Sequence, residues 1–249
     1  MNINIYNVIW VERLDSTQTY LKGLNLDILP EWSIVATKNQ TQGKGQGKNK
    51  WESEEGKNLT FSLLLKPTFL PIADQFLITQ VLSLGICDFL SKYIRDVSIK
   101  WPNDIYVRKN KICGMLVQNK IIGSEFTCAV CGIGININQI NFLLAPNPTS
   151  MKLETKQEFS IESILFEILD CLKLRYDMLK SKHGFNFKKE YLERLLYYNV
   201  FAKYCYNNVE DIEARIIDVN EFGHLVLMKK DKKELVAELK QLKFYHELV

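Results

Sequence analysis

The sequence lacks several features that would place the protein in a specialised class. It holds no run of 18 apolar residues, and residues 1–10 show neither the basic start nor the long apolar core of a signal peptide. The sequence also has little excess of charge of either sign, because 32 Lys and Arg residues are nearly balanced by 29 Asp and Glu residues. A net charge of +3 is too small to predict nucleic-acid binding from electrostatics. We therefore expect a cytoplasmic protein that binds neither membranes nor nucleic acid.

Cysteines do not mark out a disulfide framework. The six of them fall inside apolar segments, which indicates reduced side chains in a core. Cys128 and Cys131 form a C-x-x-C pair, which in other proteins is half of a zinc site or a redox motif. They lie in an apolar run, 126–133, that is typical of a strand, where side chains three positions apart point to opposite faces. We therefore expect two packed thiols and no metal site.

Apolar periodicity predicts an α+β fold. With 47% hydrophobic residues and 249 positions, the chain can bury a core in one large domain, with room for a small second one. Short polar turns between the apolar runs of 97–138 predict a meander of hairpins, and residues 139–159 are expected to form a surface loop. The expected strands cover residues 4–11, 32–38, 59–66, 97–100, 104–108, 111–118 and 124–138, and the expected helices cover 16–21, 76–93, 160–180 and 190–198.

After residue 199 the pattern changes to short alternating segments. Four strands are expected there, at 200–206, 212–219, 225–229 and 235–239. Strands this short and closely spaced are typical of a small barrel. We expect a domain boundary near residue 197, with one domain at 1–196 and another at 197–249.

The segment 40–51 interleaves three glycines with three lysines and ends at Trp51. Glycines let backbone N–H groups approach an anion, lysines add positive charge, and an aromatic ring can cover a purine. The phosphates of a nucleotide would suit this loop. Its spacing matches neither a P-loop nor a dinucleotide-binding G-x-G-x-x-G motif. The alternative is a mobile basic surface loop.

Three further segments could build a site. In Lys100-Trp-Pro-Asn-Asp104 a strand runs into a proline, so polar groups stand at a strand end beside an indole; the alternative is an ordinary turn with a buried tryptophan. Lys111 could hold a carboxylate while Gly114 lets a ligand approach the backbone, unless the lysine is simply solvated. In 132–138 isoleucines alternate with Gly and Asn, which predicts either a smooth ligand-binding face or close packing of a central strand.

Taken in order, these segments and Asp15-Ser-Thr17 resemble the motifs of biotin protein ligases. The resemblance spans residues 13–138, and the Lys100–Asp104 segment is its most specific part. It implies a class II synthetase-like catalytic domain, with a mixed, largely antiparallel sheet and flanking helices, followed by a small C-terminal SH3-like β-barrel. Because Ser16 and Thr17 stand so near the start, it also implies the monofunctional type without an N-terminal DNA-binding domain, and no operator binding.

The resemblance implies a two-step reaction. Biotin and Mg²⁺-ATP give biotinyl-5′-AMP and pyrophosphate, and a lysine of a biotin carboxyl carrier domain then takes the biotin. Lys111 and Lys44 are the implied catalytic residues. No protein ligand for Mg²⁺ is identified, because the metal is expected to ride on the phosphates. The implied binding residues are Ser16, Thr17 and Gln18 at the ureido ring, Gln40 on the biotin side, Gly43, Lys44, Gly45 and Gln46 in the loop, Trp51, Asn103 and Asn136 at the adenylate or triphosphate, and Lys111, Gly114, Gly132 and Gly134.

Departures from the family pattern concern affinity more than reaction type. The family loop usually reads close to G-R-G-R-x-G-R-x-W, whereas Lys44 and Gln46 stand here at two arginine positions and Gly47 comes one place early. Gln18 also stands where asparagine is common. Lysine lacks the bidentate fork of arginine, so a looser grip on the adenylate is expected.

Two other functions stay open at the level of the sequence. A lipoate or octanoate ligase or transferase shares the architecture, but an arginine-rich glycine triplet is expected there in place of Lys100–Asp104. A non-catalytic sensor of biotin or nucleotide is the second. The oligomeric state is open between a monomer and a homodimer.

Overall fold

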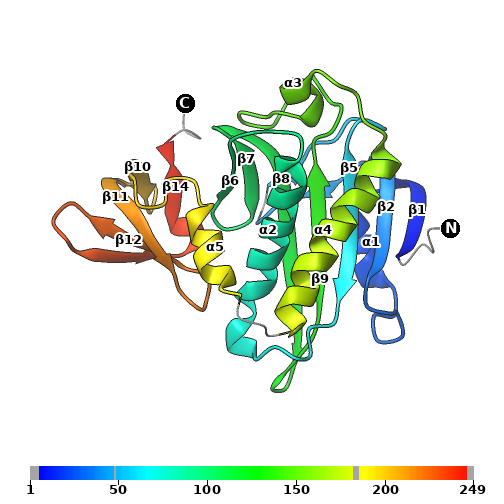
Figure 1. Ribbon diagram of the computed structural model, residues 1–249, viewed down its shortest axis with the longest axis horizontal. Coiled ribbons are helices and arrows are strands. Elements are labelled where there is room, and N and C mark those ends of the chain that lie inside the picture. Colours follow the sequence, from blue (N-terminus) through cyan, green and yellow to red (C-terminus); the bar gives the residue numbers. More distant parts are fainter. Residues whose placement is uncertain (1–5, 48, 182–184, 246–249) are drawn as a thin grey trace.

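A seven-stranded mixed sheet forms the centre of the protein (Figure 1). The computed structural model describes residues 6–47, 49–181 and 185–245. Strand β1 is parallel to β2, and all other neighbours in the sheet are antiparallel. In spatial order the strands are β1 (Asn7–Leu14), β2 (Ser33–Gln40), β5 (Leu59–Leu65), β9 (Glu125–Ile135), β8 (Asn110–Ile122), β7 (Asp104–Val107) and β6 (Val97–Lys100).

Helices cover both faces of this sheet. The long helices α2 (Phe76–Ser91) and α4 (Ile161–Ser181) lie across one face, where the main core is buried (Figure 1). The short helix α1 (Thr17–Gly23) packs with a smaller apolar cluster that includes Val35 and Val130. The predicted α+β class and the hairpin meander of β6 to β9 are thereby confirmed.

Helix α2 is apolar on most sides because strands β6 and β7 and helices α4 and α5 (Phe187–Glu193) all pack against it. The stretch Ile72–Ser91 is long and apolar enough to cross a membrane by length and composition alone, but most of it is buried inside the fold, as in a core helix. Gly85 allows the close approach of the two helices, since an added Cβ there would lie 3.1 Å from the Cα of Leu172. A side chain at this position would push α2 and α4 apart.

The C-terminal part forms a second, five-stranded antiparallel sheet. It follows α5 (Phe187–Glu193) and lies beside it in Figure 1. Its strands in spatial order are β13 (Glu234–Ala237), β12 (Leu225–Lys229), β11 (Glu210–Val219), β10 (Phe201–Tyr206) and β14 (Leu242–Phe244). Among the described residues β13 and β14 are not paired, so closure into an SH3-like barrel stays a prediction.

The structure corrects several expected elements. Residues 139–159 are not loop throughout, because α3 (Met151–Thr155) begins where the Ser150 side chain accepts a hydrogen bond from the Leu153 backbone N–H at 3.2 Å. Helix α5 was expected at 190–198 but begins at Phe187, capped by Asn186. It ends at Glu193, before Leu195 bridges to Ile99 of β6.

Several strand predictions were incomplete, and the two-residue strands β3 (Gly43–Lys44) and β4 (Lys50–Trp51) were not expected. Strand β14 was missed, since its three residues are too few for a periodicity and it forms only by pairing with β10. The first strand was expected at 4–11 but runs over Asn7–Leu14, and residues 1–5 lie outside the described part.

The C-x-x-C pair is divided by the sheet, as predicted. Cys131 belongs to the main core, whereas Cys128 packs in the smaller cluster on the other face. All six cysteines are free. Burial raises the pKa of the Cys131 thiol well above its ordinary value and that of Cys87 to about 12. Within the described ranges, no group of three or more His, Cys, Asp or Glu side chains could hold a metal ion.

Candidate active site

A cavity of about 550 Å³ collects most of the segments singled out in the sequence. It lies between the start of α1, strands β8 and β9, the loop that carries β3 (Gly43–Lys44) and β4 (Lys50–Trp51), the turn 100–104 and strand β14. Of the predicted binding residues, Gly43 and Asn136 do not line it. Those that do are Ser16, Thr17, Gln18, Gln40, Lys44, Gly45, Gln46, Trp51, Asn103, Lys111, Gly114, Gly132 and Gly134.

The floor of the cavity is a strip of glycines on two paired strands. Gly114 of β8 stands opposite Gly134 of β9, and Gly132 follows on the same face. A Cβ added to Gly134 would lie 2.6 Å from the Trp51 Nε1 atom, and one added to Gly132 would lie 3.1 Å from Gln18 Oε1. Trp51 and Gln18 therefore rest directly on the backbone. The close-packing interpretation of this strand is therefore confirmed. Gly132 and Gly134 also line the cavity, and ligand binding on this face stays a prediction.

Helix α1 is anchored at the cavity by its first residues. The Ser16 side chain caps the helix by accepting a hydrogen bond from the Thr19 backbone N–H at 3.3 Å. The Thr17 backbone N–H donates to Gln40 Oε1 at 2.9 Å, and the Thr17 and Ser62 hydroxyls are 2.9 Å apart. Ser62 was missed in the sequence. Its only signal is a hydroxyl within the apolar run of β5.

Gln18 also holds the wall together. Its Nε2 donates to the carbonyl oxygens of Leu116 and Val130, at 2.9 and 3.2 Å. These bonds tie α1 to both β8 and β9. The glutamine side chain is long enough to reach these carbonyls from α1. Gln18, which stands where asparagine is common in the family, therefore has a structural role here.

Lys111 forms the central ion pair of the cavity. Its Nζ lies 2.6 Å from Asp104 Oδ2 and 5.9 Å from the centroid of the Trp51 ring. The side chains are 26% and 20% exposed, so the pair is partly solvated and contributes at most about 1 kcal/mol to stability. Its main effect is to orient the ammonium group. Asp104 was quoted within its motif but was not assigned a role.

The turn 100–104 is fastened on both sides. Asn103 Nδ2 donates to the Met115 carbonyl of β8 at 2.5 Å. Trp101 is buried, and its Nε1 donates to the Gly223 carbonyl of the C-terminal sheet at 2.9 Å. Trp101 is thus buried, as the alternative interpretation expects, and it also lines the cavity together with Asn103 and Asp104.

The glycine and lysine loop folds as a small hairpin. Gly43 pairs with Trp51, where an added Cβ would lie 2.5 Å from the Trp51 carbonyl oxygen, so its place is in the hairpin rather than on the cavity wall. Lys44 Nζ donates to the Thr19 hydroxyl at 3.1 Å. Lys48, the middle lysine of this loop, lies outside the described residues.

Asn136 anchors the connection to α3. Its Nδ2 donates to the Thr149 carbonyl at 2.9 Å, and its backbone carbonyl accepts from the Met151 N–H at 3.0 Å. The Oδ1 atom is buried and has no hydrogen-bond partner among the described residues. Contact of Asn136 with an adenylate stays a prediction.

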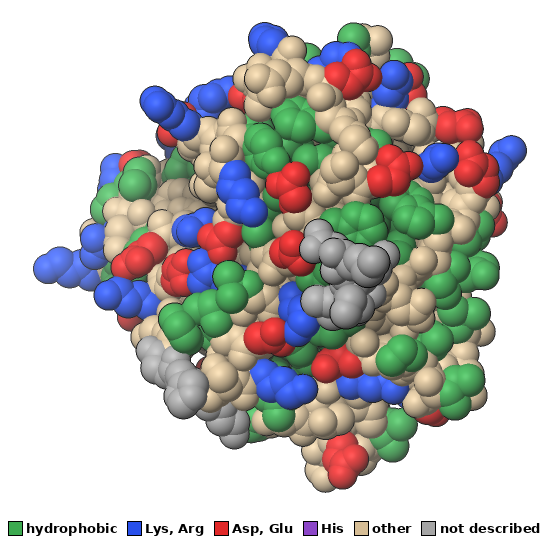
Figure 2. Space-filling view, turned by 45° about the vertical axis from the view of Figure 1, so that its right-hand side comes forward, with side chains coloured by type: hydrophobic (Ala, Val, Ile, Leu, Met, Phe, Trp, Pro, Cys, Tyr) green, Lys and Arg blue, Asp and Glu red, His purple; other side chains and the backbone are tan. Residues whose placement is uncertain are grey.

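The cavity is strongly cationic. Asp104 is the single carboxylate among its described lining residues, which include six lysines: Lys44, Lys50, Lys100, Lys111, Lys240 and Lys243. By contrast, basic and acidic side chains are interspersed on the face shown in Figure 2. Lys243 comes from β14 of the C-terminal sheet and Lys240 from the short 3-10 helix Leu239–Gln241 just before it; both were missed, because nothing local in the sequence links them to the cavity. The arrangement can concentrate an anion such as a polyphosphate or a carboxylate.

Comparison with known proteins agrees with this geometry. The model of the Biotin/lipoate A/B protein ligase family matches residues 10–136. The chain is 28% identical over 189 residues to the bifunctional ligase/repressor BirA of Bacillus subtilis, covering 72% of this chain and 56% of that protein. It is 33% identical over 136 residues to the chloroplastic biotin–protein ligase 1 of Arabidopsis thaliana, covering 53% and 36%. It thus spans about half the length, or less, of these relatives.

Solved structures extend the likeness beyond the motifs. The biotin protein ligase of Aquifex aeolicus, solved in complex with biotin and ATP, superimposes with a TM-score of 0.76 at 25% identity, covering 95% of this chain and 97% of that one. The likeness therefore includes the C-terminal sheet. With a family match over half of its length, the chain belongs to the biotin/lipoate A/B protein ligase family.

Proposed function

We propose that the protein is an ATP-dependent biotin–protein ligase. The observation that carries this proposal is the cationic cavity above the glycine strip, in which six lysines face one carboxylate. Its volume of about 550 Å³ falls within the range of sites that bury a small organic ligand. A relative of similar fold was solved with biotin and ATP, which supports the choice of these two substrates.

In the first step, a carboxylate oxygen of biotin attacks the α-phosphorus of ATP, and the bond to the β-phosphate oxygen breaks. Pyrophosphate leaves, and biotinyl-5′-AMP forms. Lys111, oriented by Asp104, stabilises the negative charge that develops on the α-phosphate oxygens, and Lys44 assists from the loop. The reaction needs mainly positioning and charge stabilisation, which a rigid β-sheet floor and fixed ammonium groups supply.

In the second step, the uncharged amine of an acceptor lysine attacks the acyl carbon. AMP leaves, an amide forms, and the amine proton passes to solvent. We propose a biotin carboxyl carrier domain as the acceptor. The division into domains at 1–196 and 197–249, a cytoplasmic location and the absence of DNA binding belong to the same proposal.

The cavity also fits a magnesium ion carried by ATP. Asp104 Oδ1 is the carboxylate oxygen that could hold it, since Oδ2 accepts from Lys111, and one carboxylate oxygen together with phosphate oxygens and waters suits this metal. Bound there, the ion would neutralise charge on the phosphates.

Exchange of radiolabelled pyrophosphate into ATP tests the proposal. Biotin-dependent exchange is expected from the purified protein, followed by transfer of biotin to a carrier domain. Exchange that depends on lipoate or octanoate instead would assign the protein to the other branch of its family. No exchange with any of these acids would contradict an activating enzyme and favour a sensor.

A further inference from the structure

Tyr191 of α5 connects a helix outside the cavity to the turn 100–104. Its side chain is buried, and its hydroxyl donates a hydrogen bond to the Pro102 carbonyl at 2.7 Å. The two residues are 89 positions apart in the sequence. Burial raises the pKa of Tyr191 well above its ordinary value, so the phenol remains a donor at any pH at which the protein would be assayed.

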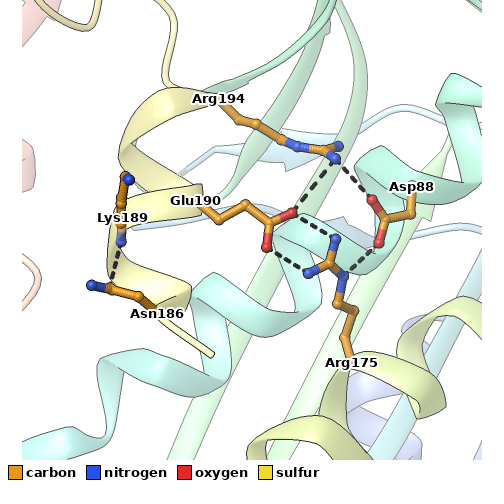
Figure 3. A network of polar contacts seen from close by, with 6 residues as sticks. All are labelled: Asp88, Arg175, Asn186, Lys189, Glu190 and Arg194. Atoms are coloured by element: carbon orange, nitrogen blue, oxygen red, sulfur yellow. Dashed lines mark hydrogen bonds and ion pairs between the residues drawn. The ribbon is translucent and has the colours of Figure 1, made fainter. Parts of the chain in front are cut away.

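Helix α5 is itself held by a network of ion pairs that joins three helices (Figure 3). Glu190 accepts two hydrogen bonds from Arg175 of α4, at 2.6 and 2.7 Å. Arg175 and Arg194 both donate to Asp88 of α2, at 2.5 and 3.0 Å. Arg175 is only 11% exposed, and bidentate, networked pairs of this kind hold geometry better than isolated surface pairs. The residue next to Glu190 is therefore well placed to fix another segment.

The second support of the turn comes from the C-terminal sheet. The Phe76 ring contacts Tyr191 edge-on, with centroids 5.8 Å apart. Phe76 also packs against Gly223, where an added Cβ would lie 2.5 Å from the ring. The Gly223 carbonyl is the acceptor for Trp101 Nε1. Tyr191, Phe76 and Gly223 thus form one continuous support behind Trp101 and Pro102.

The front of the same turn faces the cavity. Asn103 bonds to β8, and Asp104 holds the Lys111 ammonium at 2.6 Å. Asp104 is only two residues from Pro102, so a small shift of the Pro102 carbonyl displaces the carboxylate. A displacement of about 1 Å in a reacting site can lower a rate by on the order of a hundredfold.

We infer that Tyr191 is a positioning residue: its hydroxyl holds the Pro102 carbonyl and thereby sets the Asp104–Lys111 pair in the cavity. The effect on rate rests on the proposed function, whereas the effect on the turn does not. Tyr191 is not among the residues that line the cavity, so it acts through the turn and not by touching a substrate.

The test compares Tyr191→Phe with Tyr176→Phe in the full chain. Tyr176 is equally buried, and its hydroxyl donates to the Glu31 carboxylate at 2.6 Å. The control therefore loses a phenol hydrogen bond that is at least as strong, from a residue that does not line the cavity. Amide hydrogen exchange of the peptide spanning residues 99–108 is measured first, without substrates. We expect faster exchange in Tyr191→Phe and wild-type exchange in Tyr176→Phe.

The second measurement is adenylation under single-turnover conditions. Tyr191→Phe is expected to lower the rate constant by on the order of tenfold or more, with the KM for biotin within about twofold of wild type. If Tyr191 only stabilised the fold, the adenylation rate constant would fall by a similar factor in both variants. Unchanged exchange at 99–108, or equal rates in the two variants, would overturn the inference. If the wild type shows no adenylation, the proposed function fails, and the exchange measurement still decides whether Tyr191 holds the turn.

Discussion

Replacing Lys111 by methionine separates charge stabilisation from folding. The substitution removes the ammonium group while keeping an unbranched side chain of similar length. The lost ion pair with Asp104 is partly solvated, so the free energy of unfolding should fall by only about 1 kcal/mol. The lost stabilisation of developing charge should lower the adenylation rate by on the order of a hundredfold, or about 2.7 kcal/mol in the activation barrier.

Lys173 provides a matched control for this experiment. It forms an ion pair of 2.6 Å with Asp177 and lies 5.8 Å from the centroid of the Trp32 ring, so both of its contacts resemble those of Lys111. It does not line the cavity. Lys173→Met should therefore change stability by a similar amount and leave adenylation unchanged.

The assay pairs thermal unfolding with the burst of acyl-adenylate formed in a single turnover. Lys111→Arg should fall between the wild type and Lys111→Met, because it keeps the charge but not the shape of the ammonium group. An adenylation rate of Lys111→Met within twofold of the wild type would refute the assignment. The assignment would also be refuted if the adenylation rate of Lys111→Met fell only in proportion to the fraction of protein that is unfolded.

Three further predictions rest on close packing and burial. Gly134→Ala should drive Trp51 off the glycine strip and lower the free energy of unfolding by about 1–3 kcal/mol, with a red shift of tryptophan fluorescence. Gly23→Ala is the control, because an added Cβ there meets nothing within 4 Å. Equal fluorescence spectra in the two variants would contradict the close contact of Trp51 with Gly134. Iodoacetamide at pH 8 should spare Cys87 and Cys131 until the protein is denatured, because burial raises the pKa of both thiols. Since the unfolded chain then loses thiol protons more readily than the folded one, the free energy of unfolding should fall as the pH rises from about 9 towards 12, and a rise would contradict the burial of these thiols.

The long elements before the C-terminal sheet could be predicted because their signals are local. Helix α2 and the strands of the meander β6 to β9 each turn apolar side chains towards a core. Their apolar residues therefore repeat with a helical or strand period that a short stretch of sequence is enough to show. The Ser16 cap is likewise written in adjacent residues. The short elements α3 and β14 carry too few residues for a period, and pairing or capping by neighbours decides them.

The sequence alone predicted most of the segments that meet at the cavity. Glycines interleaved with lysines, and a proline at the end of a strand, form short patterns that can be recognised from adjacent residues. Only the tertiary structure decided how these groups are aimed. Trp101 bonds to Gly223, 122 positions away, and Tyr191 bonds to Pro102, 89 positions away. Lys243 reaches the cavity only because β14 pairs with β10, and Lys240 lies just before that strand. Contacts of this kind leave no local pattern, because they form only where the C-terminal sheet and α5 pack against the seven-stranded sheet and its turns.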